Sequence, residues 1–167
     1  MTNASGTNLG ERSEGASPRL RDEPRNDSAN SSLETEVTIQ VPFYDLDPMN
    51  IVWHGNYARY FEVARCALLE RLRYSYEDMA ASGYAWPVID LHLRYIKPLR
   101  FNQQVKVRAR IVEWEHRLKL DYLISDAATG ERCCRGKSVQ VAVNAATGEM
   151  CLMSPDVLFE RLGVAKP

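Results

Sequence analysis

The feature of this sequence that most constrains its fold is a run of four alternating stretches in the second half of the chain. In each stretch apolar residues alternate with polar ones, as expected for a β-strand with one buried face. The apolar positions are Ile89, Leu91, Leu93 and Tyr95; Val105, Val107, Ala109 and Ile111; Leu118, Leu120, Tyr122 and Ile124; and Val139, Val141 and Val143. Turns such as 98–102 and 126–130 are too short for parallel crossovers, so we predict mostly antiparallel strands.

One further strand and one long helix precede these four strands. The strand begins near Glu36 and alternates as far as Phe43, and Pro42 close to its end indicates a sheet edge or an exit from the sheet. The helix is predicted from residue 55 or 56 to about 73, because apolar residues recur at helical spacing. This apolar stripe is Tyr57, Tyr60, Phe61, Ala64, Ala67, Leu68 and Leu72. The prediction is an α+β fold in which an antiparallel sheet wraps around one long central helix.

Two shorter helices and an N-terminal tail complete the predicted organisation. Ser75 and Gly83 suit the two ends of a short helix over 76–82, and Pro155 suits the first position of a terminal helix over 154–162. Residues 1–33 are rich in polar residues and show no regular apolar period, so we predict a disordered tail. Residues 34–167 are predicted to form a single domain, which is long enough to bury a core.

The overall composition argues against several classes of partner. The 167 residues are 45% hydrophobic and 26% charged with a net charge of −1, which gives no indication of binding to nucleic acid or to an anionic membrane. No apolar run approaches the roughly 20 residues of a membrane span, and the N-terminus shows no signal peptide. The cysteines match no zinc pattern, so we expect reduced thiols in a cytoplasmic protein. They are Cys66, Cys133, Cys134 and Cys151.

The segment between the first strand and the long helix concentrates the polar chemistry of the chain. Residues 45–57 read Asp-Leu-Asp-Pro-Met-Asn-Ile-Val-Trp-His-Gly-Asn-Tyr, and residues 60–65 read Tyr-Phe-Glu-Val-Ala-Arg. With the element order and with Tyr-Ile-Lys-Pro-Leu at 95–99, this segment resembles the hotdog-fold acyl-CoA thioesterases. It is most similar to the 4-hydroxybenzoyl-CoA thioesterase family, including the short-chain acyl-CoA thioesterases associated with the Tol-Pal system. The resemblance covers roughly residues 36–160.

The resemblance implies an acyl-CoA thioesterase whose active site lies between two subunits of a homodimer or homotetramer. Asp47 matches the family's catalytic carboxylate, which acts as a nucleophile or as a general base that activates water. The backbone amide at His54 matches the group that polarises the thioester carbonyl, and Gly55 follows it at the helix start. For the His54 side chain, catalysis and packing both stay open. The implied substrate is an acyl-CoA or acyl carrier protein thioester, and no cofactor is expected.

The chemistry of these residue types supports hydrolysis independently. A carboxylate can bring oxygen to a thioester carbonyl by either route. The first N–H groups of a helix have no intrahelical acceptor and lie at the positive end of the helix dipole, so they suit a developing oxyanion. Gly55 permits close approach of the substrate to the backbone. Asn50, where many relatives have glycine, tolerates a positive φ.

Further substrate contacts are predicted around this segment. The loop and the helix start contribute Met49, Asn50, Val52, Trp53 and Tyr57. Arg94 and Lys97 are candidates for contacts with the CoA phosphates, but a solvated outer sheet face explains the same charges equally well. Asp45 is expected to be structural, with a hydrogen bond to the turn. Glu62 either reaches the site through a partner or is an exposed helix residue beside Arg65.

Three alternatives to a thioesterase account for parts of this sequence. A hotdog dehydratase or hydratase pairs a histidine with an acidic residue on the helix, whereas Asp47 precedes the helix, which favours hydrolysis. A non-catalytic acyl-binding module is the second alternative. A calcium loop is the third and fails, because Met49, Asn50 and Asn56 occupy places that need an oxygen ligand, a glycine and a glutamate. We therefore predict no metal site.

Overall fold

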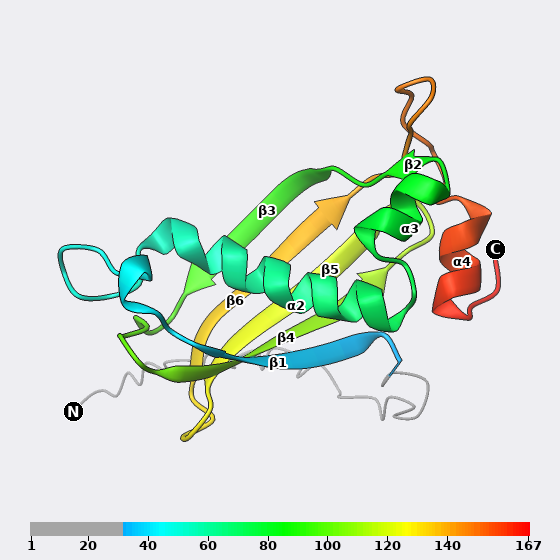
Figure 1. Ribbon diagram of the computed structural model, residues 1–167. Coiled ribbons are helices and arrows are strands. Elements are labelled where there is room, and N and C mark those ends of the chain that lie inside the picture. The colour runs from blue at the N-terminus through cyan, green and yellow to red at the C-terminus, as the bar shows by residue number, and fades with distance from the viewer. Residues whose placement is uncertain (1–31) are drawn as a thin grey trace, which may run out of the picture.

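The computed structural model describes residues 32–167 and contains a five-stranded antiparallel sheet with a long helix across one face (Figure 1). The strand order is β1-β4-β5-β6-β3. The strands are β1 (Glu34–Gln40), β3 (Val88–Tyr95), β4 (Gln104–Glu113), β5 (Leu118–Asp126) and β6 (Arg132–Gln140). The long helix is α2 (Tyr57–Arg71), preceded by the 3₁₀ turn η2 (His54–Asn56). The predicted α+β architecture is confirmed.

The core lies between α2 and the inner face of the sheet. Every second side chain of β4 and β5 points to this face, and all eight predicted apolar positions in these two strands are buried. Phe61 of α2 stacks on Tyr122 of β5 with ring centroids 4.6 Å apart. Gly136 of β6 makes room for this stack, because a Cβ there would lie 2.3 Å from the Phe61 ring. This packing holds α2, and with it the loop that precedes the helix, against the sheet.

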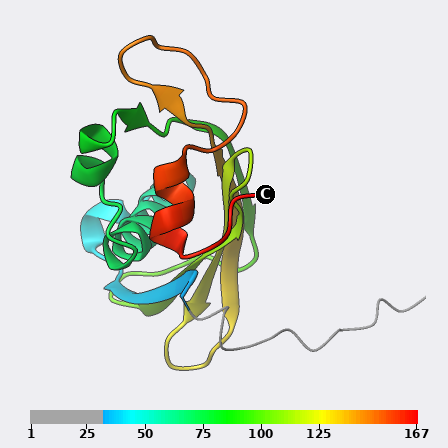
Figure 2. The same cartoon turned by 90° about the vertical axis from the view of Figure 1, so that its right-hand side faces the viewer.

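The opposite face of the sheet carries none of the described helices. Figure 2 views the sheet nearly edge-on, and α2, α3 (Tyr76–Ala81) and α4 (Asp156–Leu162) lie on one side of it. The strands therefore present their polar residues outward on the other side, as the alternation predicts for β4. This face is the outer face below.

Strand β3 departs from its predicted pattern. The alternation predicts one buried apolar face, yet Ile89, Leu91 and Tyr95 are 43–60% exposed. The reason is position: β3 is an edge strand that pairs only with β6 among the described residues, and α2 packs mainly over β1 and β4. The prediction of a buried face on β3 is wrong for the single chain.

The smaller elements correct three further details. The fourth predicted strand is interrupted: β6 ends at Gln140, and Val143–Asn144 forms β7, which pairs with the unpredicted β2 (Tyr84–Ala85). Helix α3 (Tyr76–Ala81) has the expected Ser75 cap, completed as a capping box by Asp78. In α4 (Asp156–Leu162), Pro155 is the N-cap and not the first helical residue.

The N-terminal boundary of the folded part lies close to the predicted one. Leu33 is buried in the core, and its carbonyl accepts a hydrogen bond of 2.9 Å from the Ile111 N–H. Residues 1–31 of the predicted tail, residues 1–33, lie outside the described residues.

Candidate active site

The loop that carries Asp47 is a tight hairpin. Leu46 and Val52 form an antiparallel bridge, the Asp47 N–H donates to the Ile51 carbonyl at 2.8 Å, and the Asn50 N–H donates to the Asp47 carbonyl at 2.9 Å. Asn50 has φ +58°, the left-handed conformation that Asn adopts more readily than most residues. Pro48 suits the second position of such a turn because its φ is already fixed near the required value. The sequence thus sets the position of Asp47 locally.

The Asp47 carboxylate helps to shape the turn and faces partly to solvent. Its Oδ1 accepts a hydrogen bond of 2.8 Å from the Met49 N–H, and no hydrogen bond or ion pair is found for Oδ2 among the described residues. The side chain is half-buried. One oxygen is therefore oriented by the backbone while the other is available for chemistry. The turn role and the proposed catalytic role are compatible.

Asp45 ties the loop to the helix. Its carboxylate is 1% exposed and accepts hydrogen bonds from the Arg59 guanidinium at 2.9 Å and from the Tyr60 hydroxyl at 2.8 Å. Its carbonyl accepts from the Trp53 N–H at 2.9 Å and from Asn56 Nδ2 at 3.0 Å. Burial and the hydrogen bond to Asp45 raise the pKa of Tyr60. Asp45 therefore has the structural role that we expected, and its hydrogen bonds extend to α2 as well as to the loop.

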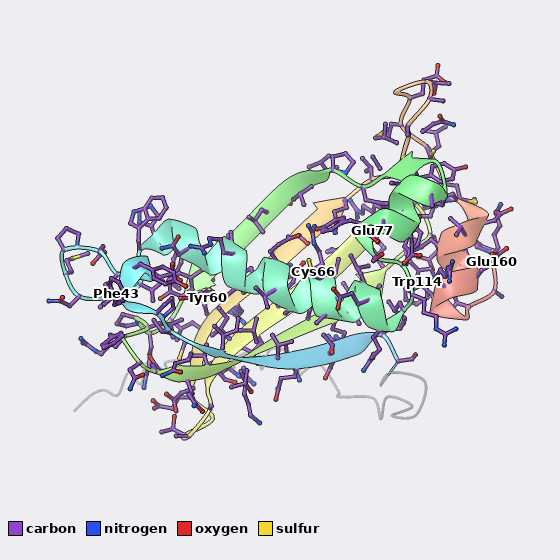
Figure 3. The ribbon with its side chains drawn as sticks, viewed as in Figure 1. Phe43, Tyr60, Cys66, Glu77, Trp114 and Glu160 are labelled. Carbon is purple, nitrogen blue, oxygen red and sulfur yellow. The ribbon has the colours of Figure 1, made fainter. Side chains whose placement is uncertain are left out.

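The loop and this part of α2 lie together at one end of the molecule. Figure 3 shows Phe43 of η1 (Phe43–Asp45) and Tyr60 of α2 toward that end, and Tyr60 is hydrogen-bonded to Asp45 of η1. Phe43 is exposed, so the predicted extension of β1 to this residue is wrong. The chain turns into η1 after Pro42, which cannot donate a hydrogen bond to a continuing ladder.

The start of the helix presents backbone donors for which no acceptor is found among the described residues. The first hydrogen bond at this end runs from the Asn56 N–H to the Trp53 carbonyl at 2.9 Å, so the N–H groups of His54 and Gly55 precede it. The Trp53 ring covers Gly55, where a Cβ would lie 2.1 Å from its Cζ3 atom. Glycine is required here because the Trp53 ring approaches the backbone closely, whereas the sequence led us to expect substrate in that space.

The end of β3 holds the helix start in place. The Tyr95 hydroxyl donates to the His54 carbonyl at 2.8 Å, and its ring meets the Tyr57 ring edge-on with centroids 5.0 Å apart. The Tyr57 hydroxyl accepts from the Leu99 N–H at 3.1 Å. The alternating pattern that identified β3 gave no signal for these contacts, which join residues about 40 positions apart.

The predicted substrate residues fall into three groups. Met49, Asn50 and Trp53 are exposed on the loop, so they are open to a ligand or a partner. Val52 and Tyr57 are each 2% exposed, and their side chains pack in the core of the single chain. Arg94 lies on the outer face, and Lys97 forms an ion pair with Glu131 at 2.6 Å. The structure does not bring these two cations into contact with the loop.

A second polar cluster on α2 was only partly anticipated. Glu62 forms an ion pair with Arg65 at 2.6 Å, and the Tyr76 hydroxyl donates to Glu62. Burial alone would raise the pKa of Glu62, but the hydrogen bonds from Tyr76 and Arg65 outweigh it and lower the pKa. Arg65 itself is buried, although its charge led us to expect an exposed side chain. This cluster fixes α3 against α2.

Fold and loop together define a protein of the hotdog thioesterase class. The chain belongs to the thioesterase-like superfamily, whose family model matches residues 41–160. Thioester hydrolysis and the predicted fold are thereby confirmed as the class of activity and the architecture.

Individual relatives agree with this assignment. A Synechocystis protein whose name places it among the esterases is 31% identical over 128 residues, 76% of this chain and 77% of the relative. The chloroplastic acyl-acyl carrier protein thioesterase of Arabidopsis thaliana is 29% identical over 107 residues, covering 64% of this chain and 56% of the relative. The DHNA-CoA thioesterase structure from Staphylococcus aureus is 29% identical with a TM-score of 0.66, covering 71% of this chain and 80% of that one.

A more distant structure supports the fold alone. The 1,4-dihydroxy-2-naphthoyl-CoA thioesterase from Synechocystis is 18% identical with a TM-score of 0.71, and the match covers 78% of this chain and 96% of that one. Among residues 32–167, no helix is long and apolar enough to cross a membrane. The same residues contain no group of three or more His, Cys, Asp or Glu side chains placed to hold a metal ion.

Proposed function

We propose that this protein hydrolyses acyl-CoA thioesters, with Asp47 as the reacting carboxylate. The observation that carries the proposal is a single loop that holds Asp47 in its hairpin and leads to the N–H groups of His54 and Gly55 at the helix start, for which no hydrogen bond is found within residues 32–167. The hydrogen bond from Trp53 to Asp45 joins these two parts of the loop directly. Such donors stabilise the oxyanion that forms when a thioester carbonyl is attacked.

The reaction follows either of two routes. As a nucleophile, an Asp47 oxygen bonds to the acyl carbon and the thiolate leaves, giving a mixed anhydride that water then cleaves to the free acid. As a general base, Asp47 takes a proton from water while the water oxygen attacks the acyl carbon, and the thiolate leaves and is protonated. Both routes release an acid and a thiol, and both use the donors of His54 and Gly55. The unengaged Oδ2 of Asp47 suits either role.

The relatives bear on the substrate class. Structures similar to this chain include a DHNA-CoA thioesterase, and a curated relative acts on acyl-acyl carrier protein. We place acyl-CoA first and acyl carrier protein thioesters second. We also assign the protein to the cytoplasm and to acyl-chain metabolism, where such thioesters occur.

We further propose a homodimer formed along β3. Its free edge exposes apolar side chains over eight residues, whereas the other edge strand, β1, exposes Glu36, Thr38 and Gln40. Unprotected apolar edges favour pairing with another strand, and a two-fold pairing of β3 satisfies both copies at once. Because Tyr95 of β3 contacts His54, the dimer would place each loop beside the partner and complete the site there.

The decisive test measures thiol release from a panel of acyl-CoA thioesters by wild type, Asp47→Asn and Glu160→Gln. The control, Glu160, is an exposed carboxylate on α4 at the far end of the molecule (Figure 3). Loss of a general base lowers the rate by about 10²–10⁴-fold, so we expect at least a hundredfold fall for Asp47→Asn and an unchanged rate for the control. Thermal unfolding checks that each variant is folded. Thiol release that persists at the wild-type rate in folded Asp47→Asn would refute the role of Asp47.

A further inference from the structure

The chain from Tyr95 to Leu99 supports the start of α2 at three points. The Tyr95 hydroxyl donates to the His54 carbonyl at 2.8 Å, where the end of β3 meets the helix start (Figure 1). Leu99 makes the other two contacts. Its carbonyl accepts from the Val52 N–H at 2.9 Å, and its N–H donates to the Tyr57 hydroxyl at 3.1 Å. This segment therefore holds the chain before, at and after the proposed oxyanion donors.

The carbonyl that Tyr95 binds belongs to the same peptide group as the Gly55 N–H. A peptide group is planar, and in the trans form its C=O and N–H point in opposite directions. A hydrogen bond that fixes the His54 oxygen therefore also fixes the direction of the Gly55 N–H. Such a bond polarises the peptide group as well, and in a chain of hydrogen bonds each one strengthens the next by roughly 10–30%.

The other proposed donor, the His54 N–H, is oriented by a backbone hydrogen bond. It shares its peptide group with the Trp53 carbonyl, which accepts from the Asn56 N–H at 2.9 Å. This bond is local, because it closes the turn at the start of the helix. The bond to the His54–Gly55 peptide is different, since it comes from a side chain of another element. Its presence depends on which residue stands at position 95.

Tyr95 is itself held at a defined position. It is the last paired residue of β3, and the N–H groups of the next two residues both donate to the Cys133 carbonyl, at 2.9 and 3.0 Å. The Tyr57 ring meets the Tyr95 ring edge-on with centroids 5.0 Å apart. Partial burial raises the pKa of the Tyr95 hydroxyl, so the group keeps its proton at neutral pH and acts as the donor. The strand end thus presents a fixed hydroxyl to the helix start.

We propose that Tyr95 is a positioning residue for thioester hydrolysis, because its hydroxyl orients and polarises the His54–Gly55 peptide so that the Gly55 N–H meets the oxyanion. This role rests on the proposed function, which assigns the N–H groups at the helix start to the oxyanion. The oxyanion develops only as the carbonyl is attacked, and an interaction made only in the transition state raises kcat without tightening substrate binding. Tyr95 therefore acts on kcat and leaves KM unchanged.

A purely mechanical tie between β3 and α2 is the simpler role for this hydrogen bond. Tyr95 is 48% exposed, so water can solvate its hydroxyl when the bond is absent, and the net contribution to folding stability is small. The hydroxyl also binds the one carbonyl whose peptide group carries the Gly55 donor. A loss of rate without a matching loss of stability distinguishes positioning from a mechanical tie.

Thiol release by the full chain tests this role in wild type, Tyr95→Phe and Tyr122→Phe, with the acyl-CoA thioester that wild type hydrolyses fastest. Tyr95→Phe removes the hydroxyl and keeps the ring. Loss of a whole oxyanion donor costs about 10²–10³-fold in kcat, so a weakened donor should cost about tenfold, with KM within about twofold of wild type. The control, Tyr122→Phe, removes a buried hydroxyl that lies 2.9 Å from Ser138 Oγ. It should lower Tm at least as much and leave kcat unchanged.

The Gly55 amide gives a second readout that does not depend on turnover. In ¹H–¹⁵N NMR spectra, loss of the hydrogen bond at the His54 carbonyl should move the Gly55 nitrogen upfield in Tyr95→Phe, whereas Tyr122→Phe should leave it in place.

Three results would overturn the role of Tyr95: a kcat of Tyr95→Phe within about twofold of wild type, a raised KM with kcat retained, or an unmoved Gly55 amide. Loss of activity in Asp47→Asn with full kcat in Tyr95→Phe would refute this role and leave the proposed function standing. A wild-type chain that hydrolyses no thioester would refute the proposed function, and this role with it.

Discussion

Replacing Asp45 by alanine should loosen the loop that carries Asp47. The Asp45 carboxylate is buried between the Tyr60 hydroxyl at 2.8 Å and the Arg59 guanidinium at 2.9 Å. Without it, the buried Tyr60 hydroxyl loses its acceptor, which costs about 1–3 kcal/mol. The Arg59 side chain is 63% exposed, so loss of that ion pair adds only about 0.2–1 kcal/mol. The expected loss of unfolding free energy is about 2–3 kcal/mol.

Urea unfolding at neutral pH measures this loss, and thiol release from an acyl-CoA measures its effect on the site. A destabilisation of this size corresponds to a fall in Tm of about 8 °C for a domain of this length. We expect the hydrolysis rate to fall as well, because Asp45 joins α2 to the same short segment as Asp47. The lower hydrolysis rate should persist at temperatures where the variant is fully folded. This result would distinguish a misplaced loop from an unfolded protein.

Two single variants measure how much each partner of Asp45 contributes to the unfolding free energy. Arg59→Ala should cost less than about 1 kcal/mol, and Tyr60→Phe about 1 kcal/mol because it removes a hydrogen bond and little volume. A double-mutant cycle between Asp45→Ala and Tyr60→Phe should give a coupling energy of about 1–2 kcal/mol. The unfolding free energy of Asp45→Ala could instead lie within about 0.5 kcal/mol of wild type, or the double-mutant cycle could show no coupling energy. Either result would mean that the hydrogen bonds of Asp45 with Arg59 and Tyr60 do not hold the loop.

Three further predictions address the sheet. Gly136→Ala should lower the unfolding free energy by about 1–3 kcal/mol in urea titrations, because its Cβ would clash with the Phe61 ring; an equal stability would contradict the tight packing there. Hydrogen bonds from Gln103 and the following turn hold the pKa of Asp126 at about 2, so its stabilising effect should be present above about pH 4 and be lost as pH falls toward 2. In thermal melts followed by circular dichroism, Asp126→Asn should abolish the loss of stability between about pH 4 and pH 2. A pH profile of stability like that of wild type would argue against this role of Asp126. Leu91→Lys should shift light scattering toward monomer, whereas an intact dimer would exclude pairing along β3.

The fold was predictable because its main signal is local. Alternation of period two and helical spacing identify β4, β5 and α2 from the sequence alone, and short turns leave antiparallel pairing as the simplest arrangement. Burial is less local: Leu91 carries the same pattern as Val107, but one lies on an edge strand and the other under α2. Which strand becomes the edge depends on the whole sheet, so the exposed face of β3 could not be read from its own residues.

The candidate site likewise has features that follow from local sequence and features that depend on the whole fold. Asp47 and the left-handed turn at Asn50 follow from a short stretch of sequence whose turn residues act on their immediate neighbours. The contact of Tyr95 with His54 and the burial of Arg65 depend on elements that meet only in the folded chain. The cations of the outer face are an intermediate case, since each strand shows its own charges but only the register shows that Arg94 lies opposite Arg135.

Strand β3 links these observations, because its free edge is the proposed dimer contact and Tyr95 at its end holds the helix start. A change in the pairing of β3 would therefore reach the proposed oxyanion donors. We expect a monomeric variant such as Leu91→Lys to lose hydrolysis, because in the proposed dimer two chains complete the site. Retention of full hydrolysis by a proven monomer would show that one chain suffices for the site.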